Sequence, residues 1–247
     1  MWYLAYGSNL DPRRFGCYLA GGRAEGGRRA YPGARDSTAP QDTAAVTAPG
    51  SLVFAGTSRQ WGGGIAFLRP DEGSRVMGRA YLVEAAQLGD VVAQEVRHEP
   101  GSEVATRVEA AVTTMGEGQR VHVAEGQYDA VVRLGSRGDV PLVAITRART
   151  ADLALGRPAP AYLWWIASGL RTTFDWPDDR IVEYLAGAPG CAGAWSPESV
   201  AAIVGAPTAT AAGSAVTDPS GPPSQRGNPT HDWAQSEPPL PLRSDPD

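Results

Sequence analysis

Apolar positions along the chain gather into short runs that predict strands, with glycine- and proline-rich turns between them. Residues 2–6 are apolar and aromatic at almost every position, which is typical of a buried strand. Residues 51–70 contain a strand, a run of three glycines and a second strand, and residues 75–83 form a third that we expect to pair with them. Three more short strands are expected within residues 120–124, 127–135 and 140–148.

Capping residues and apolar spacing mark the helices. Asp11 and Pro12 supply an N-cap and a first helical residue, so a short helix is expected from there to Gly21. A longer helix is predicted over about residues 84–96. Three later helices are expected over residues 160–171, 177–187 and 196–205, the last with Ser196 as its cap.

The order of these elements predicts an α+β fold, in which a small antiparallel or mixed, barrel-like sheet is flanked by helices. We expect one domain over residues 1–205. Residues 206–247 are rich in proline, serine, threonine, alanine and glycine, with too few apolar side chains to offset the entropy of ordering. We therefore expect this stretch to be a disordered tail.

Composition narrows the range of functions. The net charge is −5, no basic run could neutralise a row of phosphates, and no apolar tract approaches membrane-spanning length. We therefore expect neither nucleic acid nor a membrane as partner. No secretory signal pattern is visible, so a cytoplasmic protein is expected.

The residue types that are missing exclude several kinds of chemistry. All 22 positions counted as lysine or arginine are arginine, which excludes Schiff-base chemistry on lysine and a Walker phosphate loop. The two cysteines, Cys17 and Cys191, have neither the Cys-x-x-Cys nor the Cys/His spacing of a zinc site. We expect no metal and no cofactor.

The first candidate site is the turn that follows the first strand. A strand that ends at Gly7 and passes directly into a helix start leaves backbone N–H groups unpaired, and these can hold a carboxylate, a phosphate or an oxyanion. The alternative is that Ser8, Asn9 and Asp11 only cap the helix and turn the chain.

The second candidate is a carboxylate on the apolar face of the predicted 84–96 helix. Glu95 continues a stripe at helical spacing formed by Leu88, Val91 and Val92. The opposite face, where charge is expected, carries Asp90, Gln94 and Arg97. A carboxylate on an apolar stripe needs a partner or the rim of a cavity, which suits a general acid or base. The alternative is a glutamate at the core edge that reaches solvent or pairs with an arginine.

The third candidate is the glycine run in residues 61–67. Three glycines before a strand remove side chains where a ligand or another backbone must come close. A flexible hairpin loop is the alternative.

Four stretches in this order resemble the γ-glutamylcyclotransferase-like family, which has a small α/β-barrel fold: YLAYGSNL at 3–10, WGGGIAF at 61–67, VMGRAYLV at 76–83 and AQE at 93–95. The likeness continues more loosely over residues 128–185, where PAPAYLWWIASG looks like the family's Pro-x-Tyr helix start.

The resemblance implies a role for each matching residue. It implies that Glu95 handles protons and that Tyr162 lies near the cavity. It also implies a substrate loop that lines the cavity and holds the γ-glutamyl group through its backbone, formed by Tyr6, Gly7, Ser8, Asn9 and Leu10.

The implied reaction acts on a small γ-glutamyl compound. Its α-amine attacks its own γ-carbonyl, closes the ring of 5-oxoproline and expels an amine or amino acid, as in glutathione metabolism. Two alternatives are a non-catalytic protein that binds a small carboxylate or peptide on the same fold, and a hydrolase that gives free glutamate.

The chain departs from the family after Glu95. The family usually turns with glycine directly after this glutamate and soon enters the next strand, whereas here Val96 follows. A polar insertion over about residues 97–126 then intervenes, and it could cover the cavity or reshape its mouth.

Overall fold

The computed structural model describes residues 1–69, 73–150 and 152–216. Met1–Val216 form one compact unit. Its centre is a six-stranded mixed sheet with the strand order β2-β5-β1-β8-β7-β6. The strands are β1 (Trp2–Ala5), β2 (Asp42–Pro49), β5 (Arg75–Leu82), β6 (Arg120–His122), β7 (Ala130–Arg137) and β8 (Val140–Thr146). Among the described strands, β1 and β8 form the one parallel pair. A separate antiparallel hairpin is formed by β3 (Ser51–Ala55) and β4 (Ile65–Arg69).

The central strand β1 is buried on both faces because its side chains alternate between two cores. Trp2 and Leu4 point into one core, which also holds the β3–β4 hairpin. Tyr3 and Ala5 point into the other. The sheet is thus the middle layer of the unit.

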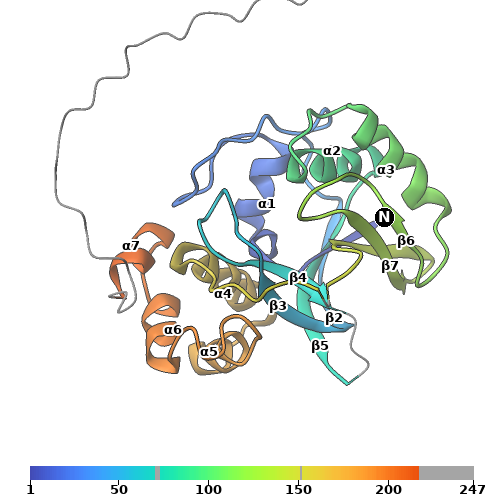
Figure 1. The fold of residues 1–247 in the computed structure, drawn as a ribbon. Coiled ribbons are helices and arrows are strands. Elements are labelled where there is room, and N and C mark those ends of the chain that lie inside the picture. The colour runs from blue at the N-terminus through green and yellow to red at the C-terminus, as the bar shows by residue number, and fades with distance from the viewer. Residues whose placement is uncertain (70–72, 151, 217–247) are drawn as a thin grey trace, which may run out of the picture. The chain divides into compact units, whose positions relative to one another are not determined.

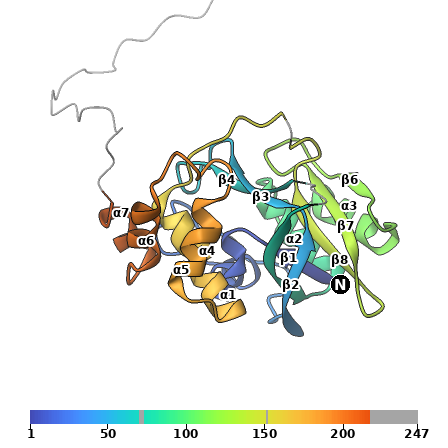
Figure 2. The same ribbon diagram turned by 90° about the horizontal axis from the view of Figure 1, so that it is seen from below.

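Helices cover both faces of the sheet (Figures 1 and 2). One core is completed by α4 (Pro160–Phe174), α5 (Asp178–Ala186), α6 (Pro197–Val204) and α7 (Ala209–Ser214). The other is completed by α1 (Pro12–Leu19), α2 (Ala85–Glu95) and α3 (Glu103–Thr114). Among the described residues, no helix is both long and apolar enough to cross a bilayer.

The α+β class and the mixed sheet are confirmed, but the sheet is not a closed barrel, since β2 and β6 form two free edges. The pairing expected for residues 75–83 is wrong. β3 and β4 pair with each other, whereas β5 lies between β2 and β1 in the large sheet. Sequence analysis missed β2 because most of its side chains are exposed and no apolar run marks it.

The expected polar insertion at 97–126 contains regular structure. Helix α3 places Val104, Ala105, Val108 and Val112 in the interior, and β6 extends the sheet at its edge. Helix α7 falls within the range expected to be a tail, and its Ala209 and Ala212 are buried. Residues 217–247 of that range lie outside the described residues.

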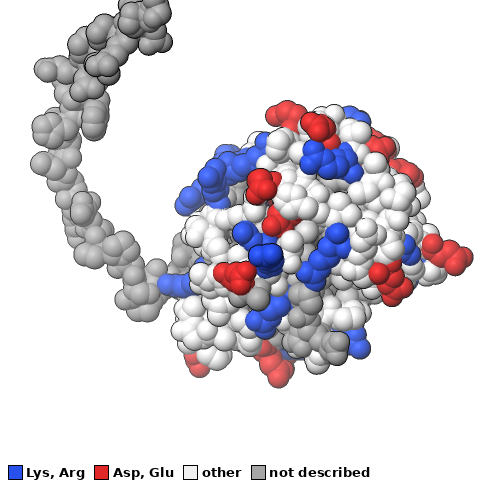
Figure 3. Space-filling model, turned by 45° about the vertical axis from the view of Figure 1, so that its right-hand side comes forward, with Lys and Arg blue, Asp and Glu red and all other residues white. Residues whose placement is uncertain are grey.

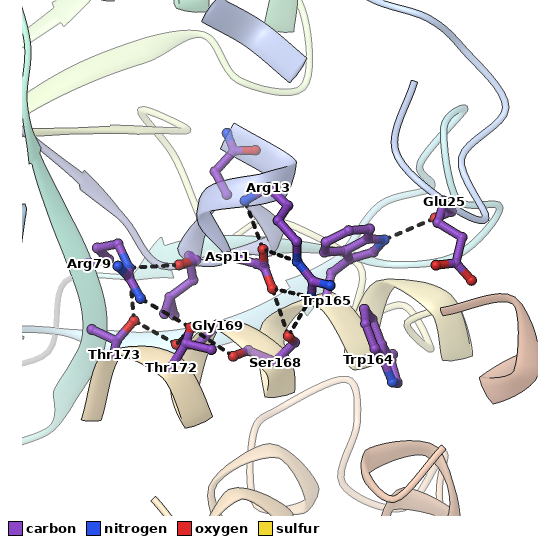
Figure 4. A network of polar contacts seen from close by, with 12 residues as sticks. Asp11, Arg13, Glu25, Arg79, Trp164, Trp165, Ser168, Gly169, Thr172 and Thr173 are labelled. Carbon is purple, nitrogen blue, oxygen red and sulfur yellow. Dashed lines mark hydrogen bonds and ion pairs between the residues drawn. The ribbon is translucent and has the colours of Figure 1, made fainter. Parts of the chain in front are cut away.

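A polar network fixes the turn after β1 against α4 (Figure 4). Asp11 caps α1 by accepting from the Arg13 backbone N–H at 2.9 Å, and its second oxygen accepts from Ser168 Oγ of α4 at 2.6 Å. From the other side, Arg79 Nε of β5 donates to the Leu10 carbonyl at 3.1 Å and to Thr173 Oγ1 at 3.0 Å. The turn is therefore held by both a helix and a strand.

Candidate active site

A cavity of about 300 Å³ lies where the turn after β1, the C-terminal end of α2 and the start of α4 meet. An inner recess of about 30 Å³ adjoins it, and both are lined by Ser8, Glu95, Tyr128 and Tyr162. A recess of that size holds one small group, while the outer cavity has the volume of a small-metabolite site. The structure therefore brings Glu95 and the turn to one cavity.

The turn that lines the recess contains backbone N–H groups without acceptors among the described residues. Residues Ser8–Leu10 form a single 3₁₀ turn, closed by the Leu10 N–H donating to the Gly7 carbonyl at 2.9 Å. Within the described residues, the N–H groups of Gly7, Ser8 and Asn9 have no acceptor. Three adjacent N–H groups without acceptors are chemically suited to an anion or an oxyanion.

Six of the seven site residues predicted from the sequence line the recess, and only Leu10 among the seven does not. The six are Tyr6, Gly7, Ser8, Asn9, Glu95 and Tyr162. Leu10 is fully buried in the core, so its side chain anchors the turn. The Tyr6 hydroxyl donates to the Ile145 carbonyl of β8 at 2.6 Å.

Glu95 is the last residue of α2 and is half-buried. Its Oε1 accepts from Asn9 Nδ2 at 3.4 Å, and the same nitrogen lies 3.4 Å from the Tyr3 hydroxyl. The other end of that amide, Asn9 Oδ1, is buried and has no hydrogen-bond partner among the described residues. An acceptor left unpaired beside a carboxylate is suited to an ammonium group.

Tyr162 lies in the first turn of α4, and its hydroxyl accepts from the Ala66 N–H of β4 at 3.1 Å. A Cβ placed on Gly7 would lie 2.9 Å from this oxygen, so glycine is needed for the close approach. Burial raises the pKa of the Tyr162 hydroxyl to about 12, with a smaller contribution in that direction from Glu95. Tyr162 is therefore protonated at neutral pH, and its O–H remains available as a donor.

Sequence analysis missed Arg14, which lines the cavity and is only 2% exposed. Its Nη2 donates to the hydroxyls of Tyr18 at 3.1 Å and Tyr31 at 2.8 Å, and the guanidinium lies over both rings and that of Trp61. Its Nε and Nη1 are buried and have no hydrogen-bond partner among the described residues. Arg14 and Tyr18 are four residues apart in α1, and this spacing on an otherwise apolar face is the signal that could have revealed the pair.

Asp90 and Gln94 lie on the face of α2 where charge is expected, but the structure buries both side chains. Asp90 accepts from the backbone N–H groups of Arg35 at 2.8 Å and Gly101 at 2.7 Å. Gln94 accepts from the Gly33 N–H at 3.3 Å. Polar side chains of α2 thus fix two loops that have few apolar residues, one containing Gly33 and Arg35 and the other containing Gly101.

The glycine run marks a close approach between backbones. A Cβ on Gly64 would collide with the Gly156 carbonyl, and the Gly64 N–H donates to the Arg157 carbonyl at 2.8 Å. This contact holds the β3–β4 loop, which places Trp61 at the cavity.

Comparisons with known proteins add a likeness in fold. No protein-family model matches the chain. The Arabidopsis thaliana protein named histone deacetylase 5 is 28% identical over 186 residues, which are 69% of this chain but 28% of that protein. Because the chain spans little more than a quarter of that relative's length, the activity in its name is not carried over.

Two solved structures are similar to the chain. An uncharacterised human protein has a TM-score of 0.45 at 18% identity, with 76% of this chain and 88% of that chain covered. A gamma-glutamyl cyclotransferase has a TM-score of 0.44 at 17% identity, with 82% and 96% covered. These likenesses concern the fold alone.

Proposed function

We propose that the protein cyclises a γ-glutamyl group to 5-oxoproline and releases an amine or amino acid, with Glu95 as the general acid and base. The observation that supports this most directly is that Glu95 and three backbone N–H groups without acceptors belong to residues lining the same small recess. One partner moves protons and the other stabilises negative charge, and an intramolecular acyl transfer needs both.

The proton balance of the reaction explains why one carboxylate is sufficient. The substrate's α-ammonium loses two protons as its nitrogen becomes the lactam N–H, and the amide nitrogen gains two as it leaves as an ammonium ion. Glu95 transfers these two protons one at a time, taking each from the attacking nitrogen and giving it to the leaving nitrogen before it takes the next. Asn9 Nδ2 orients the carboxylate, while the unpaired Asn9 Oδ1 accepts from the ammonium before attack.

Negative charge develops on the γ-carbonyl oxygen as the new carbon–nitrogen bond forms. The free N–H groups of Gly7, Ser8 and Asn9 can stabilise that oxygen or hold the α-carboxylate. The Tyr162 hydroxyl remains protonated and is a further donor beside Gly7. Arg14 supplies a fixed positive charge at the cavity.

Product analysis by mass spectrometry tests the proposal. The protein is incubated with γ-glutamyl amino acids, γ-glutamyl amines and glutathione, and the expected product is 5-oxoproline with the free amine. Free glutamate would instead identify a hydrolase. Binding of a γ-glutamyl compound without any product would identify a non-catalytic binding protein and contradict the proposal.

A further inference from the structure

We infer that Arg29, Arg59 and Arg97 form an anion subsite at the cavity mouth, which binds a carboxylate or phosphate on the leaving half of the substrate. This inference rests on the proposed function, because it identifies which half of a γ-glutamyl compound the mouth recognises. The three arginines belong neither to the turn after β1 nor to the hydrogen-bonded pair of Glu95 and Asn9.

The charge that lines the cavity is the first observation. Four arginines and two glutamates line it, a net charge of +2 in a chain whose net charge is −5. On the face drawn in Figure 3, basic and acidic side chains are interspersed and neither sign forms one large patch. A cavity with this excess favours a ligand with net negative charge.

Arg29, Arg59 and Arg97 also lack carboxylate partners among the described residues. Other arginines of the chain form ion pairs, at 2.8 Å for Arg13 with Asp11 and 3.1 Å for Arg35 with Asp90. In the part of the chain that the structure describes, no ion pair involves Arg29, Arg59 or Arg97. Their charges are therefore available to a ligand.

The backbone of Arg97 is the second, independent observation. Helix α2 ends in a Schellman motif, in which the His98 N–H donates to the Ala93 carbonyl at 2.8 Å and the Arg97 N–H to the Gln94 carbonyl at 3.3 Å. Arg97 holds the left-handed position of that motif, with φ of 69°. Glycine is the residue that adopts this conformation without strain, yet an arginine that lines the cavity stands here. Its side chain has a use that offsets the strain.

The Arg29 side chain is held in position by its own contacts. It is half-buried, its Nη2 donates to the Gln94 carbonyl at 2.8 Å, and its guanidinium lies 4.6 Å from the centre of the Tyr31 ring. One carbonyl, that of Gln94, therefore accepts from the Arg97 backbone and from the Arg29 side chain. The remaining side-chain donors of Arg29 make no hydrogen bond within the described residues and can bind an anion.

The chemistry of the substrate decides which group binds there. The γ-glutamyl half carries one ammonium and one carboxylate, so it adds no net charge to the cavity. The unpaired positive charge at the mouth is matched only when the leaving half is anionic, as in a γ-glutamyl amino acid, a γ-glutamyl peptide or a γ-glutamyl derivative of a phosphorylated amine.

The test compares three probes that differ only in the leaving half: γ-glutamyl-glycine, its carboxamide and γ-glutamyl-aminoethyl phosphate. We expect kcat/KM for at least one anionic probe to exceed that for the carboxamide by about 10-fold, the scale of one charge-assisted hydrogen bond. The ratio between the two anionic probes distinguishes carboxylate from phosphate.

Arg97→Gly is the decisive variant, because it removes the side chain and relieves the backbone strain, so loss of folding cannot explain its effect. It should reduce the preference for the anionic probe about 3- to 10-fold. Asp175→Gly is the matched control. Asp175 is the other non-glycine residue with positive φ among the described residues, at the end of α4 and outside the cavity lining, and its variant should keep the full preference.

Equal kcat/KM for the anionic probes and the carboxamide, or an Arg97→Gly variant with an unchanged preference, would overturn the subsite. Calorimetric binding of the same probes separates this outcome from failure of the proposed reaction. Tighter binding of an anionic probe that depends on Arg97, without 5-oxoproline, would support the subsite and refute the cyclase. Equal binding of all three probes without turnover would refute both.

Discussion

The contact between Gly7 and the Tyr162 hydroxyl should make Gly7→Ala destabilising in a way that depends on Tyr162. The new Cβ would lie 2.9 Å from the hydroxyl oxygen, 3.4 Å from the Ala66 Cβ and 3.9 Å from Tyr162 Cζ. Only the first of these is shorter than an ordinary contact. Relief therefore requires the hydroxyl to move, and this motion breaks its 3.1 Å hydrogen bond from the Ala66 N–H.

The magnitude follows from that bond. Ala66 is fully buried, and a buried N–H left without its partner costs about 1–3 kcal/mol. We expect Gly7→Ala to lower the free energy of unfolding by about 2 kcal/mol in the natural chain. In Tyr162→Phe the oxygen is absent and the nearest ring carbon is 3.9 Å away, so the same change should cost less than about 0.5 kcal/mol.

Urea denaturation of the natural chain, the two single variants and the double variant measures this coupling. Any backbone effect of alanine at position 7 is common to both backgrounds and cancels in the cycle. A coupling energy of about 1–2 kcal/mol with unchanged m-values is expected. Additive effects of the two substitutions would refute the contact as the reason for glycine at this position.

Two further predictions concern stability. Burial raises the pKa of the Tyr162 hydroxyl from 10.0 to about 12, so the folded state holds that proton more tightly than the unfolded state does. The contribution of this proton to the free energy of unfolding is fully present below pH 10 and is lost between pH 10 and 12. Denaturation curves at increasing alkaline pH should therefore show a falling free energy of unfolding together with tyrosinate absorbance, and a flat profile through this window would contradict the burial. Asp11→Ala should lower the free energy of unfolding by about 2–3 kcal/mol, because it removes the α1 cap and the acceptor of Ser168 Oγ, whereas Asp11→Asn keeps an acceptor and should cost less. Equal losses in the two Asp11 variants, measured by urea denaturation, would show that the hydrogen bonds are not responsible.

Local sequence signals were sufficient to predict the strand and the helix that meet at the turn after β1. The apolar run before Gly7 and the Asp11–Pro12 start specify β1 and α1, and both elements form as expected. The helical spacing that placed Glu95 on the apolar face of α2 is also consistent with its half-buried position beside Asn9. These predictions depend only on residues within a few positions of one another.

Other features depend on contacts that no local pattern reveals. Asp90 is buried because loops distant in the chain donate to it, and the sequence around α2 carries no sign of them. The edge strand β2 forms because β5 offers it a ladder of partners, although its own side chains are mostly exposed. Arg14 is tolerated in the interior because tyrosines from two segments surround it.

The measurement that tests the central claim most directly is the formation of 5-oxoproline by the natural chain and by Glu95→Gln under identical conditions. Glutamine keeps the size of the side chain and an acceptor oxygen for Asn9 Nδ2, so binding and the melting temperature should change little. We predict that turnover of a γ-glutamyl substrate falls about 10²- to 10⁴-fold, the contribution of general acid–base catalysis. A folded Glu95→Gln protein that forms 5-oxoproline at the natural rate would contradict the role assigned to Glu95.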